Sequence, residues 1–284
     1  MSNIDVLEGG HKLPLVEDFY TIQGEGFHTG KPAYFIRLGG CDVGCAWCDA
    51  KYTWNPRMYP PTEIEDIVER AVACAAQSIV ITGGEPLLYP LDALTQSLKS
   101  RGLAIFLETS GSHPFSGVFD WVCLSPKRKA APLEEAYGRA NELKVIIQSE
   151  EDLKWAEECA AKVGKDCLLF LQPEWSVAEE VMPMLVEYAK SNPAIEQISI
   201  NFHTPYPGTE YLMLPIEKKV EIIDKVIAYK KKGYPIMNSV SGLKLMKRNA
   251  LGEIKLGKEC FVTNFIYTDG SRSLCLGYGT EQCR

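Results

Sequence analysis

Short runs of β-branched and aromatic residues alternate along the chain with longer stretches whose apolar positions recur at helical spacing. This alternation is typical of an α/β domain built on a mostly parallel sheet. The pattern predicts strands from Ala33 to Leu38, Ser78 to Thr82, Leu103 to Glu108, Trp121 to Leu124, Leu143 to Ile147, Leu168 to Leu171, Gln197 to Phe202 and Pro235 to Met237. It predicts helices from Thr62 to Ala76, Leu91 to Lys99, Glu150 to Val163, Ala178 to Lys190 and Ile216 to Lys232. Eight strands with intervening helices favour a partial or complete (βα) barrel.

The pattern degrades after residue 238. Residues 239–258 are basic and punctuated by glycine, and a hairpin is predicted beyond them, with strands over 261–268 and 273–277 around the turn residues Asp269 and Gly270. We therefore expect a barrel domain over residues 1–238 and a small cysteine-containing appendage over residues 239–284.

Composition and charge narrow the function classes. The 284 residues are 46% hydrophobic and 24% charged, which suits a large buried core. Thirty Lys and Arg against thirty-seven Asp and Glu give a formal charge of −7, which argues against binding to nucleic-acid phosphates or to anionic lipid. No apolar run is long enough to cross a bilayer, and the first ten residues lack the features of a signal peptide. We expect a cytoplasmic protein with a small-molecule or protein partner.

The most specific motif is a cluster of three cysteines directly after the first predicted strand. Cys41, Cys45 and Cys48 form a C-x3-C-x2-C spacing. Three thiolates from one loop can ligate three irons of a [4Fe-4S] cluster and leave the fourth iron open to a chelating ligand. A zinc site is the alternative, but closed structural zinc takes four N or S ligands and no fourth ligand lies nearby in sequence. The other cysteines in predicted helices and strands read as small core residues.

A second motif follows the next predicted strand, where Gly83, Gly84, Glu85 and Pro86 form a G-G-E-P turn after Thr82. Two glycines allow the backbone to pass close to a ligand, and the carboxylate can accept from an ammonium. Together with the cysteines, this motif resembles the radical S-adenosylmethionine superfamily. The resemblance implies that S-adenosylmethionine chelates the open iron, that the G-G-E-P turn holds its methionyl amine, and that later strand ends complete its site. Those strand-end residues are Glu108 and Ser110 toward the ribose, Ser125 and Lys127 toward the methionyl carboxylate, and Gln172 toward the adenine.

A narrower resemblance begins upstream, at F-Y-T-I-Q-G-E-G over residues 19–26, and extends over about residues 12–192. Gln23 and Glu25 lie two residues apart, so an amide and a carboxylate can face one side of an extended segment and read the edge of an aminopyrimidinone ring. Arg37 supplies a bidentate cation for a carboxylate, with a surface ion pair as the alternative. These residues resemble the 7-carboxy-7-deazaguanine synthase family, and the resemblance places Thr82 with them at the substrate.

The family resemblance implies a radical S-adenosylmethionine lyase of queuosine biosynthesis. It implies that 6-carboxy-5,6,7,8-tetrahydropterin is converted to 7-carboxy-7-deazaguanine with release of ammonia, using a [4Fe-4S] cluster, S-adenosylmethionine, Mg²⁺ and a flavodoxin-like electron donor, in a homodimer. One departure concerns Mg²⁺, because Ala50 stands where many members have a threonine ligand. Asp49 or Thr53 would then have to substitute.

The C-terminal third departs from the family more strongly. The segment over residues 198–208 replaces the family's S-L-Q-T-H-K strand, and the chain continues well beyond it. That tail resembles a different, larger radical S-adenosylmethionine protein, with a junction near residues 191–198. Cys260, Cys275 and Cys283 provide three thiolates for an auxiliary cluster, or are free cysteines of a packed hairpin. A radical S-adenosylmethionine activase or peptide-modifying enzyme is the alternative function, although it would not need Gln23, Glu25 and Arg37.

Overall fold

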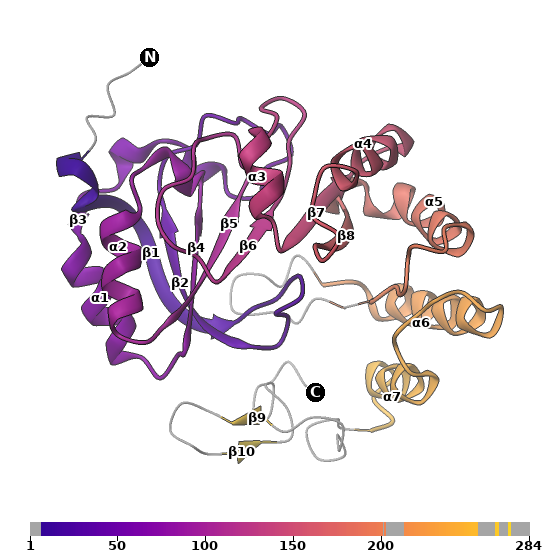
Figure 1. The fold of residues 1–284 in the computed structure, drawn as a ribbon. Helices are drawn as coiled ribbons and strands as arrows, with labels where there is room; N and C mark the ends of the chain where they lie inside the picture. The colour runs from indigo at the N-terminus through magenta and orange to yellow at the C-terminus, as the bar shows by residue number, and fades with distance from the viewer. Residues whose placement is uncertain (1–6, 201, 203–212, 255–264, 267–271, 274–284) are drawn as a thin grey trace. The chain divides into compact units, whose positions relative to one another are not determined.

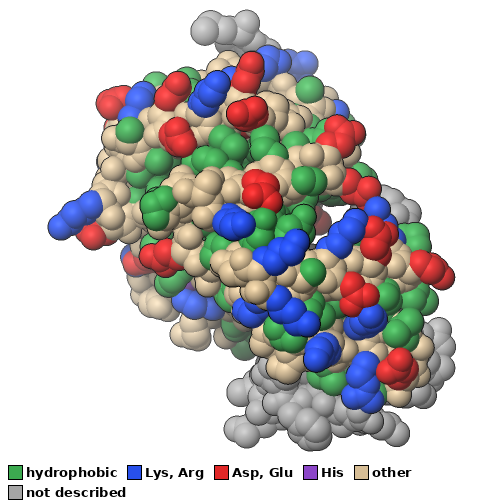
Figure 2. Space-filling model, turned by 90° about the vertical axis from the view of Figure 1, so that its right-hand side faces the viewer, with side chains coloured by type: hydrophobic (Ala, Val, Ile, Leu, Met, Phe, Trp, Pro, Cys, Tyr) green, Lys and Arg blue, Asp and Glu red, His purple; other side chains and the backbone are tan. Residues whose placement is uncertain are grey.

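The computed structural model describes residues 7–200, 202, 213–254, 265–266 and 272–273 (Figure 1). The chain forms two compact units, residues 1–181 and 182–284. This boundary lies earlier than the one expected at residue 238, because apolar residues of the helix that crosses it pack into the second core. On the face drawn in Figure 2, acidic and basic side chains both occur among apolar ones. No helix within the described residues is long and apolar enough to span a membrane.

The first unit contains an eight-stranded sheet in the order β3-β1-β2-β4-β5-β6-β7-β8 (Figure 1). The strands from β2 to β8 in that order are parallel, whereas β1 pairs antiparallel with both β2 and β3. The sheet is open, with β3 and β8 at its edges, so the expected α/β fold with a partial barrel is confirmed and the complete barrel is not formed. The strands are β1 (Lys12–Ile22), β2 (Pro32–Leu38), β3 (Pro61–Glu63), β4 (Ser78–Gly83), β5 (Ala104–Thr109), β6 (Trp121–Leu124), β7 (Glu142–Ile147) and β8 (Leu168–Pro173).

Strand β1 is the main element that the hydrophobic pattern missed. Its pairing with β2 contains a register shift between Leu15 and Glu17, which interrupts the alternation of inward and outward side chains on which the pattern depends. Pro14 and the acidic pair Glu17 and Asp18 weaken the strand signal further. The strand forms because β2 and β3 flank it on both sides.

The helices of the first unit lie close to their predicted positions. They are α1 (Ile64–Ala73), α2 (Asp92–Ser100), the unpredicted α3 (Glu134–Arg139) and α4 (Glu150–Ala160), and α5 (Ala178–Ser191) crosses into the second unit. One face of the sheet packs against α1 and α2 through a core in which Ile36, Ile81 and Leu107 are fully buried. Because side chains alternate along each strand, the opposite face collects the intervening residues. We call this opposite face, which carries Arg37, Thr82, Phe106, Glu108, Cys123 and Lys144, the inner face.

The second unit has a small core of its own. Val186 of α5 packs there with Ile223 and Val226 of α6 (Ile216–Lys231) and with Leu243 of α7 (Val240–Ala250). Helix α7 lies in the stretch after residue 238 where the hydrophobic pattern degrades, and no helix was predicted there. Ser239 caps its N-terminus by accepting a hydrogen bond from the amide of Gly242 at 3.0 Å.

The two strands predicted last in the barrel do not join the sheet in the part of the chain that the structure describes. Ile198 and Ile236 form a single parallel bridge instead, within the second unit. The predicted hairpin is represented by β9 (Phe265–Ile266) and β10 (Arg272–Ser273), which pair antiparallel. Cys260, Cys275 and Cys283 lie outside the described residues.

Candidate active site on the inner face of the sheet

The three-cysteine loop leaves the carboxyl end of β2 and is held by backbone hydrogen bonds. The amides of Gly40 and Cys41 donate to the carbonyls of Thr53 and Trp54 at 2.6 and 3.2 Å, and the amide of Cys48 donates to the carbonyl of Cys45 at 3.1 Å. All three cysteines are partly buried and free. The loop therefore presents its thiols from a fixed backbone at the end of the parallel strands where (βα) barrels bind ligands.

The G-G-E-P turn after β4 packs directly against this loop. The amide of Gly84 donates to the carbonyl of Leu38 at 2.9 Å, and the amide of Glu85 donates to the carbonyl of Gly40 at 2.8 Å. A Cβ on Gly84 would lie 2.1 Å from the carbonyl oxygen of Gly40, and one on Gly83, whose φ is +136°, would lie 2.1 Å from that of Leu38. Only glycine allows this approach, so the two motifs form one structural element.

The chemistry of the thiols fits a [4Fe-4S] cluster better than a single metal ion. Among the described residues, no three Cys, His, Asp or Glu side chains converge as the ligands of one ion would. Each thiolate of a cluster binds a different iron, so three cysteines need not converge on one point. Burial raises the pKa of the Cys41 and Cys45 thiols, while the Lys127 ammonium acts against this at Cys45. A bound cluster would have to supply the positive charge that keeps these thiols deprotonated.

Glu85 is held by several hydrogen bonds from its own chain. It is 1% exposed and accepts hydrogen bonds from Thr109 Oγ1 at 2.6 Å, the Ser110 amide at 2.8 Å, Ser110 Oγ at 2.5 Å and the Leu87 amide at 3.1 Å. These bonds tie the turn after β4 to the end of β5. The Ser110 hydroxyl thus donates its hydrogen bond to Glu85. The backbone of the G-G-E-P turn, and not the Glu85 side chain, contacts the cysteine loop. Pro86 begins a short 3-10 helix, Pro86–Leu88, and is buried.

Lys127 lies beside the cysteine loop, as a ligand of a cofactor carboxylate would. Its Nζ donates to Ser125 O at 2.6 Å and to Ser125 Oγ at 2.7 Å, and it lies 5.6 Å from the centre of the Trp47 ring. Burial lowers the pKa of Lys127, and the neighbouring Cys45 acts in the opposite direction. The structure thus brings Ser125 and Lys127 together, with Lys127 close enough to Cys45 to affect the pKa of its thiol.

Gln23 and Glu25 reach the inner face from the loop between β1 and β2. Lys144 Nζ of β7 lies 2.7 Å from Glu25 Oε2 and 3.1 Å from Glu108 Oε2, and Gln23 Nε2 donates to Glu108 Oε1 at 3.1 Å. Desolvation raises the pKa of Glu25, but Lys144 and the Gln172 amide outweigh it and lower that pKa. Burial lowers the pKa of Lys144, but Glu108, Cys123 and Glu25 together outweigh it and hold that pKa well above its ordinary value. Sequence reasoning missed Lys144, because nothing local distinguishes it from a surface lysine.

Arg37 lies on the inner face of β2, where Thr82 of β4 is its neighbour in the sheet register. Its Nε lies 2.7 Å from Glu17 Oε1, and the side chain is 22% exposed. The guanidinium is thus paired with a carboxylate of this chain, and Tyr52 OH also donates to that carboxylate at 3.4 Å. Thr82 and Gln172 are both partly buried on or near the inner face.

The two candidate Mg²⁺ ligands differ in accessibility. Thr53 is fully buried, and its hydroxyl donates to the carbonyl of Ala50 at 2.7 Å. That hydroxyl therefore stabilises the helical turn Lys51–Trp54 behind the cysteine loop. Asp49 is exposed directly after Cys48, and its carboxylate is accessible to a ligand.

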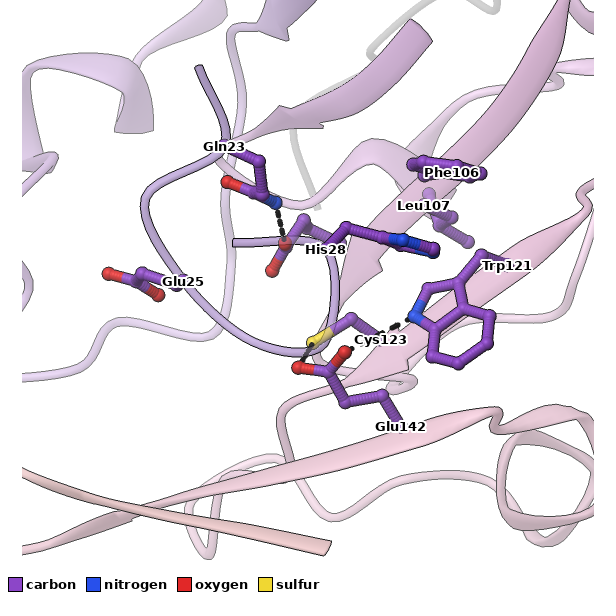
Figure 3. Close-up of a pocket in the computed structure, with 9 residues that line it drawn as sticks. Gln23, Glu25, His28, Phe106, Leu107, Trp121, Cys123 and Glu142 are labelled. Atoms are coloured by element: carbon purple, nitrogen blue, oxygen red, sulfur yellow. Dashed lines mark hydrogen bonds between the residues drawn. The ribbon is translucent and has the colours of Figure 1, made fainter. Parts of the chain in front are cut away.

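A cavity on the inner face collects further residues that the sequence did not indicate. It is lined by Gln23, Glu25, His28, Phe106, Leu107, Glu108, Trp121, Cys123 and Glu142 (Figure 3). Glu142 is 3% exposed and accepts from the Phe27 amide at 3.1 Å and from Trp121 Nε1 at 3.2 Å. Burial raises the pKa of Glu142. Aromatic faces and buried polar groups thus adjoin the Gln23 and Glu25 loop.

Comparisons with known proteins agree with this arrangement. The model of the Radical SAM superfamily matches residues 35–137, which include both the cysteine loop and the G-G-E-P turn. The fold and the three-cysteine site therefore define a radical S-adenosylmethionine protein. The 7-carboxy-7-deazaguanine synthase of Flavobacterium psychrophilum is 52% identical over 209 residues, which are 74% of this chain and 96% of the relative. The synthase of Synechocystis sp. is 49% identical over 162 residues, 57% of this chain and 78% of the relative.

A solved structure gives the same result. The crystal structure of QueE from Escherichia coli matches with a TM-score of 0.56 and 34% identity, covering 67% of this chain and 96% of that one. The chain belongs to the 7-carboxy-7-deazaguanine synthase family. The match to the first relative leaves about a quarter of the chain outside it.

Proposed function

We propose that this protein converts 6-carboxy-5,6,7,8-tetrahydropterin to 7-carboxy-7-deazaguanine with release of ammonia, as a radical S-adenosylmethionine lyase of queuosine biosynthesis. The observation that carries the proposal is the packing of Gly84 against Gly40, which joins the G-G-E-P turn to the three-cysteine loop. Membership of the synthase family, with a match over 96% of the relative from Flavobacterium psychrophilum, supports the choice of reaction.

Cys41, Cys45 and Cys48 would hold the [4Fe-4S] cluster, and the G-G-E-P backbone with Ser125 and Lys127 would hold S-adenosylmethionine. When bound, these groups supply a carbon-centred radical that abstracts hydrogen from the substrate. The chain's own residues bind, orient and exclude water. Lys127, already beside Cys45, would place a cation next to the methionyl carboxylate. Burial of Glu85 keeps the turn rigid, so that its backbone groups hold their position without reorganising.

Substrate binding would use the inner face. Arg37 would release the Glu17 carboxylate and bind that of the substrate. The Arg37–Glu17 pair is partly exposed, and the two competing carboxylates present the same geometry to the guanidinium. Gln23, Glu25 and Thr82 would line the site, while Glu108, Ser110 and Gln172 would face the nucleoside part of the cofactor. Aromatic walls from Phe106 and Trp121 would keep water from the reacting carbon.

The finer expectations follow from the same family. We expect Asp49 to take the place of the missing threonine if Mg²⁺ binds, because Thr53 donates its hydroxyl to the Ala50 carbonyl. We further expect a homodimer, a cytoplasmic location and reduction by a flavodoxin-like donor. Metal-dependent turnover, sedimentation and electron transfer from a reduced flavodoxin test these points one by one.

The test is an anaerobic assay of the reconstituted full-length protein with S-adenosylmethionine, dithionite and 6-carboxy-5,6,7,8-tetrahydropterin. We expect 7-carboxy-7-deazaguanine and ammonia in equal amounts. Cleavage of S-adenosylmethionine without conversion of the pterin would contradict the proposed substrate and would favour the alternative of a peptide-modifying enzyme.

A further inference from the structure

One polar atom of the cavity has no partner in the described part of the chain. His28 is 8% exposed and lines the cavity, and its Nε2 is buried without a hydrogen bond (Figure 3). A buried polar group left unpaired destabilises the folded chain. Such groups are few in native proteins and call for an explanation, of which a ligand that supplies the missing partner is one.

The neighbour of the other ring nitrogen decides what Nε2 offers. Lys31 Nζ lies 2.8 Å from His28 Nδ1. An ammonium has donors only, so Nδ1 must accept, and the single proton of the neutral ring then resides on Nε2. Burial, and secondarily Lys31, lower the pKa of His28, which keeps the ring neutral at pH 7. His28 thus presents a buried N–H donor without a partner among the described residues.

Aromatic contacts fix the direction of this donor. The His28 ring stacks on Phe106 with the ring centroids 4.2 Å apart and the ring planes 5° from parallel. Trp121 packs edge-on against the His28 ring at 4.6 Å, and Phe27 does so at 5.1 Å. A ring held on several sides loses little freedom when it forms one more hydrogen bond, which favours binding.

The polar groups that the sequence assigned to the substrate ring are already in use. Gln23 donates through Nε2 to Glu108 and accepts through Oε1 from the Gly24 amide at 3.0 Å. Glu25 pairs with Lys144. Among the cavity residues, the His28 donor remains open, and Glu142 Oε1, contacted by the Cys123 thiol at 3.6 Å, lies in the same lining. A donor next to aromatic faces suits a planar heterocycle that carries an acceptor.

We propose that His28 donates a hydrogen bond from Nε2 to a carbonyl oxygen or unprotonated ring nitrogen of the substrate's heterocycle. This inference rests on the proposed function, and it adds His28 to the residues that select the substrate. His28 then contacts the ring from the loop that also carries Gln23 and Glu25, and Phe106 holds it in place.

The experiment measures the dissociation constant of 6-carboxy-5,6,7,8-tetrahydropterin for the reconstituted full-length protein with S-adenosylmethionine and without reductant, so that no chemistry occurs. His28→Phe keeps the stacked ring and removes the donor, whereas His28→Gln keeps a donor and removes the ring. His11→Phe, at an exposed position, is the matched control. We expect His28→Phe to weaken binding by about 10- to 100-fold, His28→Gln to recover most of that loss, and the control to bind like the wild type.

The outcomes separate this inference from the proposed function. Wild-type protein that fails to bind the pterin would overturn both. Wild-type binding with an unchanged constant in His28→Phe would overturn the His28 assignment alone, as would His28→Gln binding as weakly as His28→Phe, because the ring and not its N–H would then matter. If His28→Phe fails to retain its cluster, His28→Met, which also has no donor, takes its place. His28→Gln should then bind the pterin more tightly than His28→Met.

Discussion

Arg37 of β2 and Glu17 of β1 are direct cross-strand partners, and the Arg37 Nε lies 2.7 Å from the Glu17 Oε1. The residue expected to bind the substrate carboxylate thus carries a carboxylate of its own chain in the substrate-free structure. The pair is partly exposed, so exchange for a second carboxylate costs little, since exposed ion pairs contribute at most about 1 kcal/mol.

Arg37→Ala should weaken substrate binding while iron content stays intact. A hydrogen bond to a charged group contributes about 2 kcal/mol, which corresponds to roughly a 30-fold increase in the dissociation constant. Anaerobic titration with the carboxytetrahydropterin measures this dissociation constant. The control is Arg70→Ala, which removes the separate ion pair with Asp18. Equal affinity of Arg37→Ala and wild type would show that the pair with Glu17 is structural only.

Replacement of any one of Cys41, Cys45 and Cys48 by Ala should abolish the cluster and all cleavage of S-adenosylmethionine. A cluster that has lost one of three thiolates from one loop keeps too few protein ligands. Cys74→Ala is the matched control, because Cys74 packs at the edge of the hydrophobic core of the first unit. Iron and sulfide analysis after anaerobic reconstitution decides the matter, and full cluster content in Cys45→Ala would contradict the assignment.

Gly84→Ala should disrupt the contact between the G-G-E-P turn and the cysteine loop. The new Cβ would lie 2.1 Å from the Gly40 carbonyl oxygen and 3.0 Å from the Cys41 Cβ, so backbone has to move. We expect loss of roughly 2 kcal/mol of stability and a cluster that is lost faster on dilution into chelator. Gly164→Ala, where a Cβ meets nothing within 4 Å, should behave like the wild type. If Gly84→Ala loses its cluster no faster than the wild type, the contact between the G-G-E-P turn and the cysteine loop does not stabilise the cluster.

Lys144→Met should destabilise the cluster-free protein near neutral pH, since it leaves Glu108 and Glu25 without their cation. Lys144 is buried and Glu108 is partly buried, whereas Glu25 is exposed, so the loss comes mainly from the contact with Glu108 and is about 2 kcal/mol. The lowered pKa of Glu25 means that its contribution is present above the pKa of the unfolded chain and is lost as pH falls through the folded value. Denaturant unfolding at pH 7 and near pH 4 should therefore show the two proteins approaching each other at the lower pH. A difference that grows toward acid would contradict the ion-pair assignment.

The cysteines of the C-terminal tail, Cys260, Cys275 and Cys283, lack a fourth partner in the sequence, so we expect no second cluster. Iron in the reconstituted protein should then be near four per chain, about the content of one [4Fe-4S] cluster. Chemical iron analysis of the wild type and of Cys275→Ala should agree. A value near eight that falls in Cys275→Ala would support an auxiliary cluster and the peptide-modifying alternative.

Local patterns in the sequence determined the parts of this protein whose physics is local. The apolar runs of β4 and β5 predict strands because every second residue, such as Ile81 and Leu107, is buried against the helices. Two motifs are also local features of the sequence. The spacing of the three cysteines limits how far apart their thiols can lie, and the two glycines of the G-G-E-P turn allow backbone conformations that other residues do not. These features were enough to indicate the fold class and the superfamily.

Only the tertiary structure decided which polar groups meet. Lys144 contacts Glu25 across 119 positions of the chain, and Ser110 holds Glu85 across 25, so neither pairing leaves a trace in a local pattern. The bulge that hid β1, and the folding of the His28 loop onto Phe106, depend on strand register and on packing between distant segments. The sequence therefore determined the candidate chemistry of the site, whereas the sheet register determined which residues share its inner face.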